Sequence, residues 1–244
     1  MLHCIIDHGN TRTKLVLIQD DNIILRETMP VLKLSELKLF LEKHNISKVA
    51  LSATGSLSDE IHNYLTHTYI YVELSHETPI PITNHYGTPQ TLGKDRLAAV
   101  IAAHNIYPSE NVLVIDAGTC VTYDFITTTG DYYGGSISPG LAMRFRAMHE
   151  FTARLPLVTL AETSDFIGHN TETAMRTGAQ FGFFYEIEGF INAYIQRFGK
   201  CITLLTGGNA SFIAQHLVHL HLEVQNDLVP IGLNVILNYN INHK

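Results

Sequence analysis

DHGNTRTK at residues 7–14 and DAGTCVTYD at residues 116–124 are two copies of one pattern. Aligning the aspartates that open the copies also aligns a glycine two residues later and a threonine six residues later. An apolar run precedes each copy, CII at residues 4–6 and LVI at residues 113–115. Each copy is therefore predicted to form a strand, a tight glycine turn and a second strand.

Such a hairpin suits the binding of a phosphate compound. Backbone N–H groups and Thr or Asn side chains near the glycine can hold phosphate oxygens, and the carboxylate that ends the first strand can hold a cation. The copies lie roughly 110 residues apart. This repetition predicts two related domains that face one nucleotide across a cleft.

The composition is that of an ordinary soluble protein. The chain has 244 residues, 45% of them hydrophobic and 16% charged, and is long enough to bury a full core. Its net charge of −7 argues against a nucleic-acid partner, which would favour a basic surface. The three cysteines stand apart inside apolar runs, which is typical of reduced thiols. Without a signal-peptide pattern or an apolar run near 18 residues, we expect a cytoplasmic protein with no membrane contact.

The rest of the chain alternates between strand and helix patterns. Ser35 and Ser58 are predicted to cap helices that extend to about residues 44 and 65. Strands are expected at 2–6, 14–18, 22–28, 48–52, 69–74, 112–116, 121–126, 132–137 and 201–205, and further helices at 97–105, after 139–140, at 171–198, before 217 and around Pro230. The alternation predicts an α/β fold with two similar domains, 1–108 and 109–244.

The long helix expected over residues 171–198 carries three glycines. Gly178, Gly182 and Gly189 fall along one side of it. Each costs about 1 kcal/mol of helix stability relative to Ala. We therefore expect another helix to approach this side closely, from the same subunit or across a dimer.

Six short motifs follow one another along the chain. They are DxGNT at 7–11, GTPxxLGxDR at 87–96, DxGTxxTxD at 116–124, GGxIxPG at 134–140, NT at 170–171 and TGG at 206–208. Together, and in this order, they resemble the motifs of the type III pantothenate kinases, bacterial enzymes of the actin/hexokinase/acetate-kinase superfamily. His8, Lys94 and Cys120 depart from the residues usual in that family, but none of them replaces a residue expected to do chemistry.

The resemblance implies two ribonuclease-H-like domains related by internal duplication, with a cleft between them, and a homodimer. It implies ATP-dependent phosphorylation of pantothenate to 4′-phosphopantothenate, the first step toward coenzyme A. It also implies Mg²⁺ and a monovalent cation such as K⁺ or NH₄⁺.

The ATP phosphates must be held by the glycine hairpins, because the chain has no Gly-x4-Gly-Lys-Ser/Thr loop. The residues assigned to ATP are Asp7, Gly9, Asn10, Thr11, Lys14, Gly118, Thr119, Thr122, Gly207 and Gly208. Alternatively, Lys14 is a solvated edge lysine, and the two glycines at 207–208 only form a turn.

Two aspartates are candidate cation ligands. Asp7 is predicted to hold Mg²⁺, directly or through water, although it would otherwise serve only to cap its turn. The resemblance assigns the monovalent cation to Asp116. Asp124 is either a supporting carboxylate behind the site or an exposed strand residue.

Asp95 is the candidate general base. A primary hydroxyl has a high pKa, so a carboxylate that accepts its proton late in phosphoryl transfer also aligns the nucleophile. Arg96 presents a planar fork of donors that can clamp anionic oxygens. Outside this motif the pair would be an acid at a helix start and a surface arginine.

The remaining substrate contacts come from the resemblance. It places Gly93 and Lys94 at the substrate together with Asp95 and Arg96. It matches Tyr86 to a tyrosine that packs on the pantoyl group, with a core tyrosine as the alternative. Thr171 matches a threonine that hydrogen-bonds the substrate.

Other polar clusters favour a structural interpretation. His216, His219 and His221 straddle a helix end without a partner carboxylate pattern, so a metal site is not expected. Arg144 and Arg146 are expected on a solvated helix face, or else in contact with a partner subunit.

Two other functions fit less well. A non-catalytic accessory or regulatory protein that keeps the fold would not need Asp7, Asp95, Arg96 and Asp116 together. A sugar or acetate kinase of the same superfamily is disfavoured, because those chains are generally longer and lack the segment at residues 87–96.

Overall fold

The computed structural model describes residues 2–9, 12–55, 57–162 and 165–243. The chain forms two compact units. The first comprises Met1–Pro108, Thr128–Tyr133 and Asp227–Lys244, and the second comprises Ser109–Thr127 and Gly134–Asn226.

The first unit is built on a five-stranded sheet of order β3-β2-β1-β4-β5. Its strands are β1 (Leu2–His8), β2 (Thr13–Gln19), β3 (Asn22–Met29), β4 (Lys48–Ala53) and β5 (Ile70–Glu73). β1 is antiparallel to β2 and parallel to β4. The predicted hairpin at residues 7–14 is therefore the β1–β2 connection.

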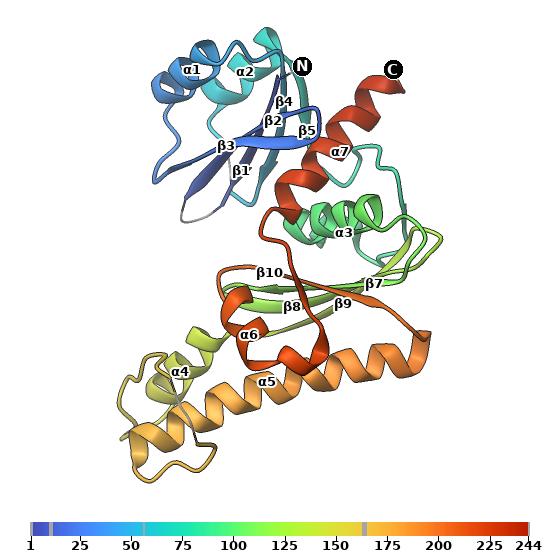
Figure 1. The fold of residues 1–244 in the computed structure, drawn as a ribbon. Helices are drawn as coiled ribbons and strands as arrows, with labels where there is room; N and C mark the ends of the chain where they lie inside the picture. The colour runs from blue at the N-terminus through green and yellow to red at the C-terminus, as the bar shows by residue number, and fades with distance from the viewer. Residues whose placement is uncertain (1, 10–11, 56, 163–164, 244) are drawn as a thin grey trace. The chain divides into compact units, whose positions relative to one another are not determined.

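Helices cover both faces of this sheet. Figure 1 shows α1 (Leu34–Lys43) and α2 (Asp59–Thr68) on one face and α7 (Leu228–Asn242) on the other. Successive strand residues point to opposite faces, so Cys4 and Ile6 join the core beneath α1 and α2. His3 faces the other way, where its Nδ1 lies 2.8 Å from Asn234 Oδ1 of α7. Burial on both faces explains the unbroken apolar run CII at residues 4–6 in the middle of β1.

α3 (Lys94–Ile106) packs against α7 in the same unit. The two helices approach closely at Gly232, where a Cβ atom would lie 1.9 Å from the carbonyl oxygen of Ala98. α3 begins three residues before the predicted start at Leu97, so Asp95 and Arg96 belong to its first turn.

Of the two predicted helix caps, one is confirmed and the other is wrong. Ser58 caps α2, where its Oγ accepts a hydrogen bond from the N–H of Ile61 at 3.4 Å. The prediction for Ser35 was wrong, because α1 already begins at Leu34 with Lys33 as its N-cap. Lys33 has the extended backbone of a cap residue but no capping side chain, so the sequence held no capping signal there.

The second unit contains the second hairpin. Its strands β11-β10-β7-β8-β9 lie in that order. They are β7 (Val112–Ala117), β8 (Cys120–Ile126), β9 (Asp131–Pro139), β10 (Ile202–Thr206) and β11 (Glu223–Val224). The first residues of β9, Asp131 and Tyr132, belong to the first unit, where they pair with β6 (Thr83–Asn84).

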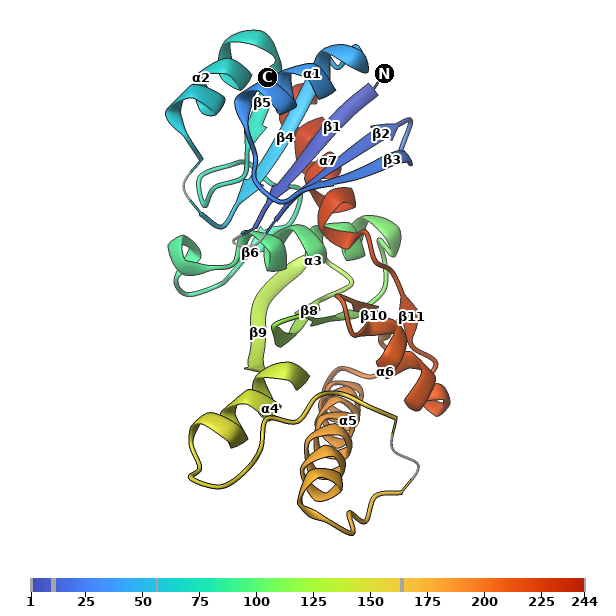
Figure 2. The ribbon, with the colours of Figure 1, turned by 90° about the vertical axis from the view of Figure 1, so that its left-hand side faces the viewer.

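Helices α4 (Leu141–Glu150), α5 (Thr171–Phe198) and α6 (Ala210–His216) complete this unit. Figure 2 shows α5 and α6 on one face of the sheet. The core between them includes Leu113, Ile115 and Tyr123 from the sheet and Phe183 and Ile187 from α5.

α5 runs over the predicted range, and its three glycines leave open space. Apart from the neighbouring backbone of α5 itself, a Cβ at Gly178, Gly182 or Gly189 would meet no described atom within 4 Å. The expected close approach of a second helix therefore does not occur among the described residues of this subunit.

The terminal segment 227–244 was assigned to the second domain from the sequence, whereas its contacts group it with the first unit. The physical reason is the apolar character of α7, whose buried side chains lie against α3, β1 and β4. The sequence shows that character but not the surface on which the helix packs. The boundary at Pro108 coincides with a unit boundary.

Candidate active site

The first hairpin carries two opposite charges on one face. Asp7 pairs with Lys14 across the β1–β2 register, and Lys14 Nζ lies 3.9 Å from Asp7 Oδ2. The lysine side chain is 47% exposed and the aspartate 19%, so the ammonium faces solvent while the carboxylate lies behind it. The N–H of Gly9 donates to the carbonyl of Arg12 at 3.1 Å and closes the turn. The predicted phosphate ligands at 10 and 11 lie outside the described residues.

Asp7 lies close to the predicted general base. Burial raises the pKa of the Asp7 carboxyl, the charge of Lys14 lowers it, and the charge of Asp95 raises it again. A pair of neighbouring carboxylates partly removed from water is a site that a hard divalent cation would neutralise. Among the described residues no group of three or more His, Cys, Asp or Glu side chains is arranged for a metal. Mg²⁺ is commonly held by one or two carboxylates with water completing its shell, so these two side chains are the ones that could hold it.

Ser52 is a buried polar residue beside this pair that the sequence patterns did not single out. It is the partner of Asp7 in the parallel β1–β4 register. Its side chain is fully buried, and its Oγ makes no hydrogen bond to any described group. An unpaired buried hydroxyl is costly, so it marks a place where a water or ligand oxygen would be stabilised. The one signal in the sequence is a serine that interrupts the apolar strand VALSA.

The first turn of α3 brings three predicted residues together. Asp95 Oδ1 accepts a hydrogen bond from the N–H of Arg96 at 2.9 Å. A Cβ on Gly93 would lie 2.5 Å from the same oxygen, so glycine leaves room for the carboxylate. The carbon at the centre of the Arg96 guanidinium lies 5.7 Å from the centre of the Tyr86 ring. Arg96 is only 7% exposed, so its interpretation as a surface arginine is wrong.

Tyr86 is held from two sides. Its N–H donates to Asn84 Oδ1 at 3.0 Å, and its ring stacks on Tyr132 with centres 6.5 Å apart. The residue remains half-buried. Its aromatic face is therefore fixed next to Arg96, and it does not belong to the fully buried core.

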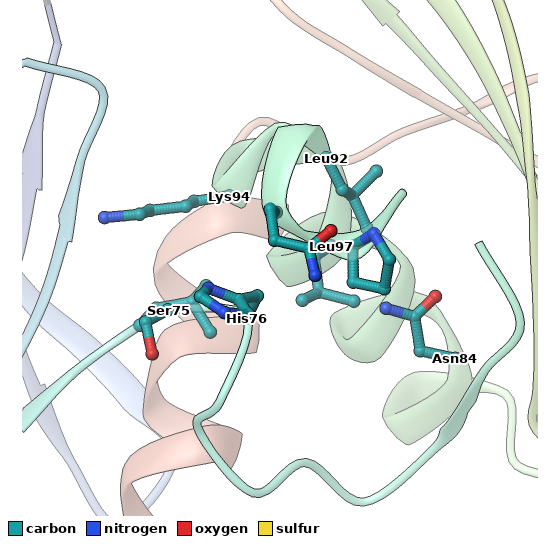
Figure 3. Close-up of a pocket in the computed structure, with 9 residues that line it drawn as sticks. Ser75, His76, Asn84, Leu92, Lys94 and Leu97 are labelled. Carbon is teal, nitrogen blue, oxygen red and sulfur yellow. The ribbon is translucent and has the colours of Figure 1, made fainter. Parts of the chain in front are cut away.

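A pocket of about 190 Å³ adjoins the same turn. Figure 3 shows Lys94 extending from the start of α3, with Ser75 and His76 on a separate segment. The lining residues are Leu74, Ser75, His76, Asn84, Pro89, Gln90, Leu92, Lys94 and Leu97. Lys94 Nζ also lies 3.9 Å from Glu73 Oε1 at the end of β5. The lysine that departs from the usual family residue is thus part of a polar pocket wall.

The second hairpin is held by backbone hydrogen bonds and has a threonine, not a lysine, opposite its aspartate. Asp116 pairs with Thr122, and the N–H of Gly118 donates to the carbonyl of Cys120 at 2.9 Å. Thr119 is exposed at the tip of the turn. Gly140 packs on this turn, where its N–H donates to the carbonyl of Thr119 at 3.2 Å.

The predicted Gly207–Gly208 turn lies beside the same hairpin. Thr206 pairs with Asp116 in the β10–β7 register. Gly207 has a φ of +89°, and a Cβ there would lie 2.4 Å from Asp116 Oδ1. This glycine is required by both its backbone angle and the close carboxylate. Gly208 is exposed, and a Cβ there would meet no described atom within 4 Å.

Two further predicted residues of the second unit have clear positions. Asp124 is 1% exposed, so its interpretation as an exposed strand residue is wrong. Thr171 is exposed at the first position of α5. It follows Asn170, whose side chain caps the helix by accepting the N–H of Thr173 at 2.9 Å.

Arg144 was predicted to lie on a solvated helix face, and this prediction is wrong. Its side chain is 21% exposed and forms an ion pair with Glu186 of α5. Arg146 on the same helix is 73% exposed, as expected. The sequence reveals the helix but not Glu186, which lies 42 residues away.

Solved structures with similar folds include kinases and proteins with other roles. An inorganic polyphosphate/ATP-glucomannokinase from Arthrobacter is 14% identical, with a TM-score of 0.53 over 98% of this chain and 99% of that chain. A Campylobacter jejuni protein assigned to the Baf family of transcriptional activators is 22% identical, with a TM-score of 0.57 over 99% of this chain and 100% of that chain. At these identities the likeness concerns the fold alone. The fold is that of the actin-like ATPase and sugar kinase class.

Sequence comparison narrows the class to one family. The pattern of the type III pantothenate kinases matches residues 4–193. A type III pantothenate kinase from Bacteroides fragilis is 40% identical over 240 residues, which cover 98% of each chain. The chain belongs to the type III pantothenate kinase family, and it is a kinase.

Proposed function

We propose that this protein transfers the γ-phosphoryl group of ATP to the primary hydroxyl of pantothenate and forms 4′-phosphopantothenate. The observation that carries the proposal is the grouping of Asp95, Arg96 and Tyr86 at the start of α3, beside Asp7, in a chain of this family. Phosphoryl transfer needs positioned charges more than covalent chemistry, and this grouping supplies them.

Asp95 is the proposed general base. Its Oδ1 is held by the N–H of Arg96, which keeps the carboxylate in place at the helix start. It would accept the proton of the substrate hydroxyl as the new P–O bond forms. Arg96, always protonated and fixed against Tyr86, would bind anionic oxygens of the substrate or the transferred group.

Each hairpin is assigned a set of nucleotide and cation contacts. In the first unit Asp7 would hold Mg²⁺, directly or through water. The residues that would contact phosphates there are Gly9, Asn10, Thr11 and Lys14. In the second unit Asp116 would hold K⁺ or NH₄⁺. The second-unit residues assigned to ATP are Gly118, Thr119, Thr122, Gly207 and Gly208. Bound Mg²⁺ would neutralise phosphate charge in the transition state.

Several residues are proposed to contact pantothenate. Tyr86, Gly93 and Lys94 are proposed contacts in the first unit, together with the base and its neighbouring arginine. Thr171 is a proposed contact in the second unit, where its exposure at a helix start leaves its hydroxyl accessible.

We also infer that the active form is a cytoplasmic homodimer. The glycine side of α5 is open to close approach by another helix. The second unit also exposes large apolar side chains, which a monomer would normally cover. They include Phe151 at 85%, Tyr185 at 61% and Leu157 at 60% exposure. No described helix is long and apolar enough to cross a bilayer.

The test of the function is an ADP-release assay with ATP and pantothenate, with and without K⁺. The proposal requires ADP release that depends on pantothenate and a product heavier by one phosphoryl group. Turnover with another small alcohol but none with pantothenate would overturn the substrate assignment. Sedimentation of the same sample tests the dimer, and a monomer at assay concentration would contradict it.

A further inference from the structure

Arg144 is a half-buried arginine that the proposed function leaves unused. Its Nε donates to the carbonyl of Pro139 at 2.9 Å. One terminal nitrogen donates to Glu186 Oε2 at 2.5 Å and to Ser138 Oγ at 3.3 Å. Its guanidinium carbon lies 5.1 Å from the ring centre of Phe183. A side chain with this many directed contacts holds its neighbours in one arrangement.

The hydrogen bond to Pro139 fixes the peptide that follows. In a trans peptide the C=O and the N–H point in opposite directions. The carbonyl of Pro139 faces Arg144, and the N–H of Gly140 in the same peptide donates to the carbonyl of Thr119 at 3.2 Å. A Cβ at Gly140 would lie 2.4 Å from that oxygen and 2.5 Å from the carbonyl oxygen of Gly118. Arg144 therefore orients a peptide that meets the turn of the second hairpin.

Glu186 and Tyr123 hold the arginine in turn. The two carboxylate oxygens of Glu186 accept separate hydrogen bonds, one from Arg144 and one from the hydroxyl of Tyr123 at 2.9 Å. Burial, and then the neighbouring carboxylate, raises the pKa of Tyr123, so its hydroxyl remains a donor. Tyr123 belongs to β8, which begins directly after the turn. These hydrogen bonds thus connect α4, α5 and β8 next to the turn of the second hairpin.

The orientation of the turn matters for an anion. A phosphate is stabilised by N–H and hydroxyl donors and repelled by carbonyl oxygens. The carbonyl oxygens of Gly118 and Thr119 lie beside Gly140, and the exposed Thr119 has a hydroxyl that can donate to an anion. If the peptide between Pro139 and Gly140 rotated, the carbonyl oxygen of Thr119 would lose the hydrogen bond from the Gly140 N–H that holds it in this direction.

We propose that Arg144 is a positioning residue for ATP, acting through the peptide between Pro139 and Gly140 on the turn at Gly118 and Thr119. Glu186 fixes the arginine. The proposal rests on the proposed ATP role of that turn. It predicts that a change at Arg144 weakens nucleotide binding and leaves pantothenate binding unchanged.

The experiment compares Arg144→Lys with Arg146→Lys on the same helix. A lysine ammonium cannot reproduce the fork that reaches Pro139 and Glu186 together. Arg144→Lys should raise KM for ATP and Kd for ADP about tenfold, with KM for pantothenate unchanged. Arg146→Lys, whose side chain is exposed, should change none of these constants. The assays run well below the melting temperature of every variant, so lost stability alone does not raise KM.

Glu186→Gln and Tyr123→Phe extend the test if the lysine variant folds poorly. Glutamine has one acceptor oxygen where the carboxylate has two, so either Arg144 or Tyr123 loses its acceptor. Glu186→Gln should therefore shift KM for ATP in the same direction, and Tyr123→Phe should shift it less. Unchanged KM for ATP and Kd for ADP in folded variants, with only a lower melting temperature, would overturn the proposal. Absence of pantothenate-dependent turnover in the wild type would instead overturn the proposed function.

Discussion

The two hairpins share a pattern but are stabilised in different ways. Across from Asp7 stands Lys14, and Asp95 lies close by. Across from Asp116 stands Thr122, and the turn is packed against Gly140 and Gly207. The first hairpin is organised by charge and the second by close backbone packing.

This difference shows how two copies of one sequence pattern can form different turns, because Asp7 pairs with the seventh residue after it and Asp116 with the sixth. Charge near the first turn suits the transfer of a phosphoryl group, because charge can position a cation and a base. Tight packing around the second turn suits a fixed set of donors for a nucleotide. Substitutions should therefore act through electrostatics in the first unit and through geometry in the second.

The largest effect is expected at the base. Asp95→Asn keeps the size of the side chain and removes its ability to accept a proton. We expect kcat to fall by about 10²- to 10⁴-fold, the usual contribution of a general base. The matched control is Asp59→Asn, an exposed acid in the first turn of α2. Near-wild-type kcat in Asp95→Asn would mean that this residue is only a helix-start acid.

Adding a methyl group to a glycine at each turn should have different effects on the stability of the two hairpins. At Gly140 the new Cβ would lie 2.4 Å from a backbone oxygen, whereas at Gly9 it would lie 3.3 Å from one. Gly140→Ala should cost about 1–3 kcal/mol of unfolding free energy, as overpacking does, and should raise KM for ATP. Gly9→Ala should cost less, because a small shift relieves its contact. Chemical denaturation and ATP kinetics on both variants measure the contrast, and equal losses would contradict it.

Asp7 should lower the stability of the unliganded protein. Its pKa is raised chiefly by burial, so the folded state disfavours the charged form. Asp7→Asn should therefore raise the melting temperature at pH 7, by about 2–4 °C for a gain near 1 kcal/mol, while it lowers activity. The advantage should shrink as the pH falls through the raised pKa, because protonation then neutralises the wild-type carboxyl. Asp20→Asn, at an exposed turn, is the control. A melting temperature that falls in Asp7→Asn at pH 7 would refute this electrostatic account.

The smallest effect on stability is expected at Lys14. The side chain is about half exposed, and its ion pair with Asp7 spans 3.9 Å. Exposed pairs contribute about 0–1 kcal/mol, so Lys14→Gln should leave the melting temperature nearly unchanged. KM for ATP should rise if the ammonium meets a phosphate. Lys48→Gln on β4 serves as the reference, and equal KM values in the two variants would identify Lys14 as a solvated edge residue.

Much of this fold follows from local patterns. Apolar runs and turn glycines predicted the strands of both hairpins, and the long helix predicted over residues 171–198 is α5. The cap at Ser35 failed, because α1 begins without a side-chain signal. The packing of α7 in the first unit could not be predicted, because an apolar helix does not specify its partner surface.

Some residues of the candidate site could likewise be predicted from the sequence, and others could not. Asp95 and Arg96 were recognisable because their chemistry lies within one short motif. Ser52 became visible only through strand register, since nothing near it in sequence relates it to Asp7. The role of Glu186 could be recognised only from the packing of α5 on α4, because this packing places Glu186 next to Arg144. Contacts between distant segments are what the sequence alone leaves undetermined.

We propose that the two repeated aspartates serve different cations. The direct test is a titration of Mg²⁺ and of K⁺ in the kinase assay with wild type, Asp7→Asn and Asp116→Asn. Asp7→Asn should raise the half-saturating Mg²⁺ concentration by at least about 10- to 100-fold, the usual effect of losing a group that only supports a metal ligand, and should keep its stimulation by K⁺. Asp116→Asn should lose stimulation by K⁺ and keep its Mg²⁺ response. The same shift in both titrations for both variants would contradict the division of roles between the hairpins.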